Sequence, residues 1–167
     1  MAASSAGILL FRRRAGELQV LLVHPGGPFW AARDLGAWSI PKGEYRGEDP
    51  LVAARREFAE ELGSPAPHGR MIDLGQVRLK SGKLVRAWGV EGDLDAGAAR
   101  SNTCEIEWPP RSGRRIEIPE VDRAEWFELE EAARRINPAQ AALLERLAEQ
   151  VGRLASNLRI EQKNPRP

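Results

Sequence analysis

Apolar positions recur along the chain at two spacings, one typical of strands and the other of helices. Residues 5–12 and 17–24 are apolar and β-branched, and the Arg14-Ala15-Gly16 segment between them predicts a β-hairpin. Residues 71–79 and 83–91 predict a second hairpin. Shorter apolar runs predict further strands at residues 37–40, 103–108, 116–120 and 123–127.

A helix is predicted over residues 50–62. One apolar stripe at helical spacing is formed by Leu51, Ala54, Phe58 and Leu62. Asp49 is a suitable N-cap, and Pro50 suits the first helical position because its missing N–H would have no partner there. Gly63 supplies the C-terminal stop. Both ends of this helix are therefore encoded locally.

Two more helices are predicted near the C-terminus. The first covers residues 130–136, and the second covers residues 138–154 and opens on Pro138. The second helix is expected to turn four apolar residues toward a mixed sheet, namely Leu143, Leu144, Leu147 and Val151. These elements predict one domain over residues 1–155. Residues 156–167 are expected to form a flexible C-terminal tail.

Length and composition are those of one ordinary domain. The chain has 167 residues and a formal net charge of +1, so its overall charge does not demand nucleic acid or a membrane surface as partner. The only cysteine, Cys104, excludes an internal disulfide and fits a reducing compartment. No apolar run approaches the length of a membrane span, and Arg12-Arg13-Arg14 follow the first apolar run, which is the wrong order for a secretory signal. We therefore expect a cytoplasmic protein. Its oligomeric state stays open.

The predicted helix over residues 50–62 carries an unusual acidic face. Glu57, Glu60 and Glu61 lie three and four residues apart and share one side of the helix. Two carboxylates drawn to about 5 Å in a partly screened cleft repel by roughly 3 kcal/mol. A hard divalent cation such as Mg²⁺ or Mn²⁺ is the natural counter-charge, since neither His nor Cys is among the ligands. The alternative is a solvated acidic face, which is the usual fate of an isolated E-x-x-E-E helix.

The context of this face resembles the Nudix box, whose pattern is G-x5-E-x7-R-E-U-x-E-E-x-G-U with U an apolar residue. Aligned on the helix, the matching residues are Arg56, Glu57, Phe58, Glu60, Glu61 and Gly63. Glu48 takes the place of the earlier glutamate, and Glu44 is a second acidic residue of the same loop. Two features depart from the pattern. Only four residues separate Gly43 from Glu48, where the family has five, and Ser64 replaces the final apolar residue.

The resemblance implies an α/β/α sandwich with a mixed sheet. It further implies hydrolysis of a nucleoside diphosphate linked to another group, with Mg²⁺ or Mn²⁺ as cofactor. By similarity, Glu57 and Glu61 are metal ligands, Glu60 is a further ligand or a base, and Arg56 orients the glutamates. Glu120 lies six residues before Trp126, where family members can carry an additional metal ligand or base.

Two loops carry residues that are candidates for phosphate binding. Lys42 and Gly43 belong to the loop that leads into the box. A later loop carries Arg111, Arg114 and Arg115, whose guanidinium groups suit phosphate oxygens. Solvated surface charge is the alternative for these side chains. Phe29 and Trp30 are candidates for stacking on a nucleobase, although burial under a loop is the commoner fate of such aromatics.

The substrate is less well defined than the reaction. Pro41-Lys42-Gly43 resembles family members that act on dinucleoside polyphosphates more than the Pro-Gly-Gly form of many nucleotide-pool enzymes. A small-molecule nucleotide is therefore the expected partner, with nucleoside triphosphates and nucleotide sugars such as ADP-ribose as alternatives. A different class of function is a nucleotide-binding regulatory module that has lost hydrolysis. The shortened loop favours that class, and the intact R-E-x-x-E-E favours an enzyme.

Overall fold

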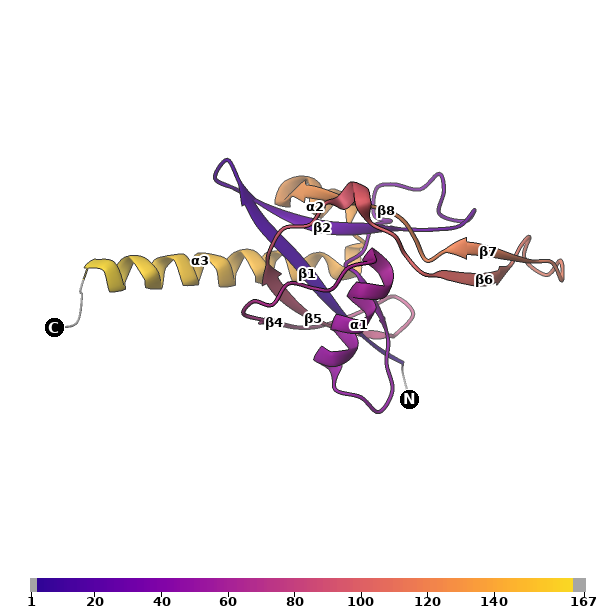
Figure 1. The fold of residues 1–167 in the computed structure, drawn as a ribbon, viewed down its shortest axis with the longest axis horizontal. Coiled ribbons are helices and arrows are strands. Elements are labelled where there is room, and N and C mark those ends of the chain that lie inside the picture. The colour runs from indigo at the N-terminus through magenta and orange to yellow at the C-terminus, as the bar shows by residue number, and fades with distance from the viewer. Residues whose placement is uncertain (1–2, 164–167) are drawn as a thin grey trace.

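The computed structural model describes residues 3–163 as a sheet with helices on both faces (Figure 1). The sheet strands are β1 (Ser4–Arg14), β2 (Glu17–Pro25), β3 (Lys42–Glu44), β4 (Ile72–Arg78), β5 (Leu84–Glu91) and β8 (Val121–Glu128). Their order is β4-β5-β1-β2-β8, and β3 pairs with β1. The β1–β5 pairing is parallel and the other pairings are antiparallel. The predicted mixed sheet is therefore confirmed.

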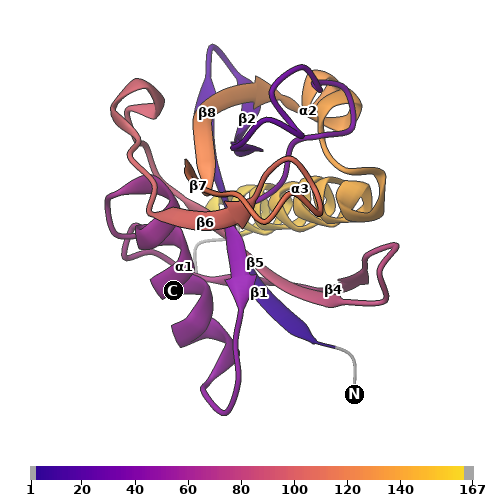
Figure 2. The same ribbon diagram turned by 90° about the vertical axis from the view of Figure 1, so that its right-hand side faces the viewer.

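Three helices complete the layers. Helix α1 (Pro50–Leu62) covers one face, whereas α2 (Leu129–Arg135) and α3 (Ala141–Lys163) cover the other. Ala6, Ile8 and Leu10 of β1 pack with the residues of α1, while Leu9 and Phe11 pack with those of α3. A strand buried on both faces needs apolar residues throughout, which explains the unbroken run in β1. The α/β/α sandwich is confirmed (Figure 2).

One predicted strand is wrong. Residues 37–40 make only isolated bridges, from Ser39 to Val23 and from Trp38 to Ile136. The Ile40 N–H, which would bond to a neighbouring strand in a sheet, donates instead to Oε1 of buried Gln140 at 3.1 Å. The short strand forms instead after Pro41, as β3.

A second, smaller sheet projects from the first. It consists of β6 (Thr103–Glu107) and β7 (Arg115–Pro119), which pair as an antiparallel hairpin (Figures 1 and 2). The segment between β5 and β6 contains the 3₁₀ turn η1 (Ala96–Ala98). Glu120 lies between β7 and β8, at the base of this hairpin.

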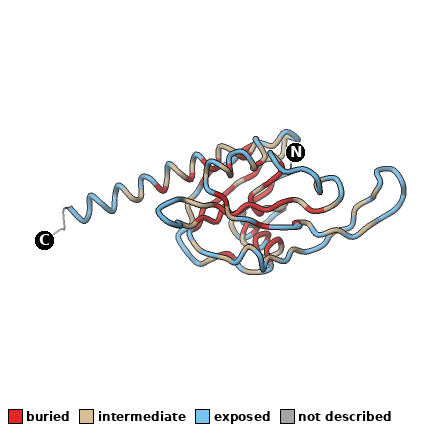
Figure 3. The backbone as a smooth tube through the Cα atoms, turned by 90° about the horizontal axis from the view of Figure 1, so that it is seen from above, coloured by how far each residue is buried: buried red, intermediate tan, exposed pale blue. Residues whose placement is uncertain are grey.

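The C-terminal helix is longer than predicted. A 3₁₀ turn η2 (Pro138–Gln140) precedes α3, and the four predicted apolar residues of α3 are buried. The helix continues to Lys163, past the start of the expected tail at residue 156, and its last turns are exposed (Figure 3). The rest of that tail, residues 164–167, lies outside the described residues. No helix within residues 3–163 is both long and apolar enough to cross a membrane.

Candidate active site

Helix α1 is fixed at both ends by the residues that the sequence singled out. The Asp49 side chain accepts hydrogen bonds from the N–H groups of Leu51 and Val52, and Gly63 adopts a left-handed conformation with φ of 74°. Phe58 and Leu62 on its inner face are buried against the sheet. This anchoring sets the direction of every carboxylate on the helix.

Three carboxylates converge where α1 meets the base of the β6–β7 hairpin. Oxygen atoms of Glu57, Glu61 and Glu120 all lie within 4.8 Å of one another. Glu57 and Glu61 are only 7% and 9% exposed, and Glu120 is half-buried. The backbone of Asn102 links the two elements, because its N–H donates to Glu60 O at 2.9 Å and its carbonyl accepts from the Glu120 N–H at 2.9 Å. The cluster is therefore built by the fold rather than by one helix alone.

The electrostatics of this cluster disfavour three negative charges. Burial raises the pKa of Glu61 to about 8, and the charges of Glu120 and Glu57 act in the same direction. Burial is also the first cause that raises the pKa of Glu57 and of Glu120, followed in each by the charge of Glu60. A raised pKa means that the ionised carboxylates lack a positive charge nearby to stabilise them. A bound cation would supply that charge, so the site favours a cation.

Arg56 offsets only part of this charge. Its guanidinium group donates to Glu48 at 2.6 Å, to Glu57 at 2.8 Å and to Glu60 at 3.4 Å. The contacts with Glu48 and then Glu57 raise the pKa of Arg56. Glu60 is turned toward Arg56 and stands beside the cluster rather than in it. Glu48 also contacts Arg56 and not the cluster itself. Arg56 in turn holds one carboxylate oxygen of Glu57.

The loop before the box passes directly over the carboxylates. A Cβ atom on Gly43 would collide with the carboxylate of Glu57, so the backbone approaches this close only because residue 43 is glycine. The Lys42 N–H donates to Oε2 of Glu61 at 3.3 Å. Burial lowers the pKa of the Lys42 amine, while the Glu61 charge opposes that shift. Lys42, Glu61 and Glu120 share a cleft of about 190 Å³.

Other predicted residues lie outside the cluster. Glu44 forms an ion pair with Lys83, a residue of the β4–β5 turn. Arg111, Arg114 and Arg115 are all exposed toward the free end of the β6–β7 hairpin, where Arg115 pairs with Glu105 at 3.0 Å. Five extended residues correspond to about 16 Å, so even Arg115 starts far from Glu120. The structure does not bring these arginines to the carboxylates, and phosphate binding by them stays a prediction. Phe29 is 50% exposed and stacks on Arg33.

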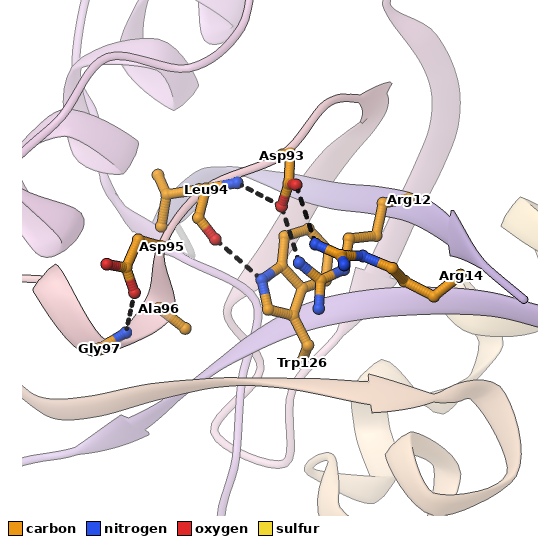
Figure 4. Close-up of a pocket in the computed structure, with 8 residues that line it drawn as sticks. All are labelled: Arg12, Arg14, Asp93, Leu94, Asp95, Ala96, Gly97 and Trp126. Atoms are coloured by element: carbon orange, nitrogen blue, oxygen red, sulfur yellow. Dashed lines mark hydrogen bonds and ion pairs between the residues drawn. The ribbon is translucent and has the colours of Figure 1, made fainter.

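A larger groove, of about 600 Å³, lies elsewhere, at the free end of the β1–β2 hairpin (Figure 4). Arg12 stacks 4.0 Å over the Trp126 ring and forms an ion pair with Asp93 at 2.7 Å. Arg14 reaches the other oxygen of Asp93 at 3.2 Å, and the Trp126 indole donates to Leu94 O at 3.0 Å. All of these groups have partners within the groove. It is a clamp that holds the segment after β5 onto the sheet.

The sequence matches the NUDIX domain family over residues 1–147. This chain belongs to the Nudix family. Helix α1 is thus the helix of its Nudix box, and its acidic face carries Glu57, Glu60 and Glu61. As a member of this family with the box glutamates in place, the chain is a pyrophosphohydrolase acting on phosphorus-containing anhydrides, and its substrates are nucleotides in general.

Solved structures share the Nudix fold at low sequence identity. The Ap4A hydrolase of C. elegans, as a binary complex, superposes with a TM-score of 0.64 at 21% identity, covering 89% of this chain and 98% of that chain. The NUDIX domain of Shewanella oneidensis NrtR complexed with ADP ribose gives a TM-score of 0.63 at 19% identity, covering 90% and 89%. RenU, a Nudix hydrolase from M. smegmatis, gives 0.53 at 24% identity, covering 89% and 85%. No curated protein matches the sequence significantly.

Two residues that shape this Nudix site escaped sequence reasoning. Asn102 acts through its backbone, so its side-chain type carries no signal. Gln140 is buried, and its amide donates to the Ser39 hydroxyl at 3.0 Å while its carbonyl accepts from the Ile40 N–H. Ser39 lines the same cleft as Lys42, so the hydrogen bond from Gln140 positions one wall of the site, although Gln140 and Ser39 are 101 positions apart in the sequence. No local pattern encodes a contact of that range.

Proposed function

We propose that this Nudix protein hydrolyses a pyrophosphate bond of a nucleoside polyphosphate with Mg²⁺ or Mn²⁺, and that a dinucleoside polyphosphate is the first candidate substrate. The observation that carries the proposal is the cluster of Glu57, Glu61 and Glu120. Its oxygen atoms lie within 4.8 Å of one another beside a cleft that Lys42 also lines. Negative ligands and a positive side chain thus meet at one cavity.

The residues fit a hard divalent cation. All three donors are carboxylate oxygens, which Mg²⁺ and Mn²⁺ prefer over softer ligands. Two of the carboxylates are buried, and their pKa values are raised, so the fold concentrates negative charge that its own arginine does not neutralise. When bound, the cation neutralises phosphate oxygens and lowers the pKa of a coordinated water.

The chain's own residues divide the remaining work. Glu57 and Glu61 hold the cation from α1, and Arg56 keeps Glu57 in place through their 2.8 Å hydrogen bond. Glu120 faces them from the hairpin base and either completes the ligand set or removes a proton from the attacking water. Glu60 is the other candidate for that base. The Lys42 amine binds a phosphate of the substrate within the cleft.

The substrate class rests on the loop before the box and on two structural likenesses. Pro41-Lys42-Gly43 resembles the form found in dinucleoside polyphosphate hydrolases, and Lys42 does line the cleft. An Ap4A hydrolase and an ADP-ribose-bound domain are among the structures that share the fold. These observations support diadenosine polyphosphates as the first compounds to test and ADP-ribose as the second.

We also propose the cytoplasm as the compartment of this enzyme. Cys104 is a free thiol in the structure, and a reducing compartment keeps such a thiol unoxidised.

A substrate panel tests the proposed function. The protein is incubated with diadenosine polyphosphates, nucleoside triphosphates and ADP-ribose, each with Mg²⁺, with Mn²⁺ and with a chelator, and the products are resolved by chromatography. We expect metal-dependent cleavage, fastest for a diadenosine polyphosphate. Cleavage that persists in the chelator contradicts the metal, and faster cleavage of another compound contradicts the substrate. Binding without cleavage of any compound supports the regulatory module instead.

A further inference from the structure

The C-terminal part of α3 extends beyond the body of the molecule (Figures 1 and 3). Val151 is the last buried residue of the helix, and Gly152 to Lys163 add about 18 Å of helix at 1.5 Å per residue. Leu158 and Ile160 on this segment are 60% and 63% exposed. We call residues 152–163 the α3 extension.

The apolar stripe of α3 does not stop where the body stops. Leu144, Leu147, Val151, Leu154 and Leu158 follow one another at alternating steps of three and four residues. That spacing is the seam of paired helices, in which apolar residues repeat every 3.5 residues on average. Val151 and Leu144 are covered by the sheet, whereas Leu158 continues the same stripe without a cover among residues 3–163. The seam therefore lacks a partner over the α3 extension.

A groove beside this stripe carries positive charge. It has a volume of about 560 Å³ and runs between the end of the sheet at Phe11 and the α3 side chains Val151, Leu154 and Leu158. Arg13 and Arg70 line the groove together with Glu91, and none of these three charged groups has an ion-pair partner within the described part of the chain. The groove thus offers an apolar floor and a net positive rim.

We propose that the α3 extensions of two copies of this chain pair antiparallel, each lying in the groove of the other. Placing Leu154 of one copy opposite Leu158 of the other sets Glu161 opposite Val151, because both pairs are symmetric about residue 156. Val151 lines the same groove as Arg13 and Arg70, so the Glu161 carboxylate meets their guanidinium groups. The match occurs twice across the two-fold axis, which is what a self-complementary interface requires.

The proposed interface is small, so the dimer is weak and depends on concentration. We expect sedimentation velocity of the full chain to show the 18.5 kDa monomer at low concentration and twice that mass at high concentration, over a range of about 10 µM to 1 mM. A chain that stays monomeric over this range overturns the proposal. So does a monomer that associates only when other proteins are added.

Two exposed residues on α3 provide a matched pair of variants. Leu158 lies on the seam, whereas Ile160 lies two residues further and about 200° around the helix. We expect Leu158→Glu to raise the dimer dissociation constant at least tenfold and Ile160→Glu to change it less than twofold. Both side chains are exposed in the monomer, so neither change should unfold it, which circular dichroism verifies. Equal effects of the two variants overturn the proposed pairing.

A charge exchange tests the orientation. Glu161→Arg should weaken the dimer, because each new arginine meets Arg13 and Arg70 of the other copy. Combining it with Arg13→Glu and Arg70→Glu should restore the wild-type dissociation constant. If the combination is as weak as the single variant, the two helices do not pair in this register and the antiparallel arrangement is wrong.

Discussion

Two groups of charged side chains lie on the α1 face of the sheet, and they differ in how their charges are balanced. At the free end of the β1–β2 hairpin, Arg12 and Arg14 both pair with Asp93, and the Trp126 ring covers one face of Arg12. In the Nudix box, the positive groups beside Glu57 and Glu61 are Arg56 and Lys42, and neighbouring carboxylates compete for the same two cations. In the first group two arginines share one aspartate, so every charge has an ion-pair partner, whereas the second group keeps an excess of negative charge.

This contrast separates a structural clamp from a reactive site. The groove at the clamp, of about 600 Å³, is larger than the cleft at the carboxylates, of about 190 Å³. Size alone would therefore select the wrong surface. Buried charge without a partner costs free energy, and a fold keeps it where a ligand supplies the partner. Unbalanced charge is the better guide to function in this molecule.

The largest effect is expected from removing one carboxylate charge in the cluster. Glu57→Gln keeps the size of the side chain and removes a ligand, so turnover should fall by about 10²–10⁴-fold with the fold intact. Asp93→Asn is the matched change in the clamp and should leave turnover within about twofold. Steady-state assays of both variants with the best panel substrate make the comparison. Similar turnover in the two variants would remove the box helix from the mechanism.

Gly43→Ala should have the next largest effect. The new methyl group collides with the carboxylate of Glu57, which must move because it is the flexible partner. A displacement of about 1 Å in a catalytic group costs on the order of 10²-fold in rate. Gly152→Ala is the control, since a Cβ atom there meets open space. Turnover and Mn²⁺ affinity should fall together in Gly43→Ala alone, and unchanged affinity would show that Glu57 is not a ligand.

The unbalanced charge also predicts how metal-free stability depends on pH. The folded-state pKa of Glu61 is about 8 and its ordinary value is 4.5, so between these values the folded chain holds a proton that the unfolded chain has lost. This contribution is fully present below pH 4.5 and is lost as pH rises through 8, with a slope of at most about 1.4 kcal/mol per pH unit. Urea unfolding at several pH values should therefore show a falling free energy. Glu61→Gln should flatten the curve, and an unchanged slope would assign the proton to another group.

The smallest effect on activity is expected from the clamp. Arg12→Gln loses the ion pair to Asp93 and the contact with the Trp126 ring, so the free energy of unfolding should fall modestly. Thermal unfolding should show the lost stability, while kcat and KM stay within about twofold of wild type. A loss of turnover as large as that of Glu57→Gln would mean that the groove takes part in the reaction.

The sequence predicted most of the fold because its signals were local. Asp49, Pro50 and Gly63 fixed both ends of α1, and the turn residues of the β1–β2 hairpin fixed its register. The strand expected at residues 37–40 failed, because buried Gln140 replaces a strand as the partner of Ile40. Such a contact joins residues 100 positions apart, and neither composition nor periodicity carries it.

The site was predicted as far as one helix could define it. Glu57 and Glu61 follow from helical spacing, and Glu120 joins them as the resemblance to the family implied. Glu60 shares the helix face but turns to Arg56, because a guanidinium lies one turn away. The arginines of residues 111–115 were predicted to bind phosphate because guanidinium groups suit phosphate oxygens, and the extended hairpin carries them away from the cluster. Glu120 stays at the base of the hairpin beside α1, whereas the arginines lie a full strand length away.

Anomalous diffraction from crystals soaked in Mn²⁺ tests the central claim most directly. We expect a peak between α1 and the hairpin base, about 2.1 Å from oxygen atoms of Glu57 and Glu61, with Glu120 in the same coordination sphere or one water away. The Glu57→Gln crystal should lose most of this peak. A site without Mn²⁺ density, or a stronger peak at Asp93 than at the box, would contradict the account.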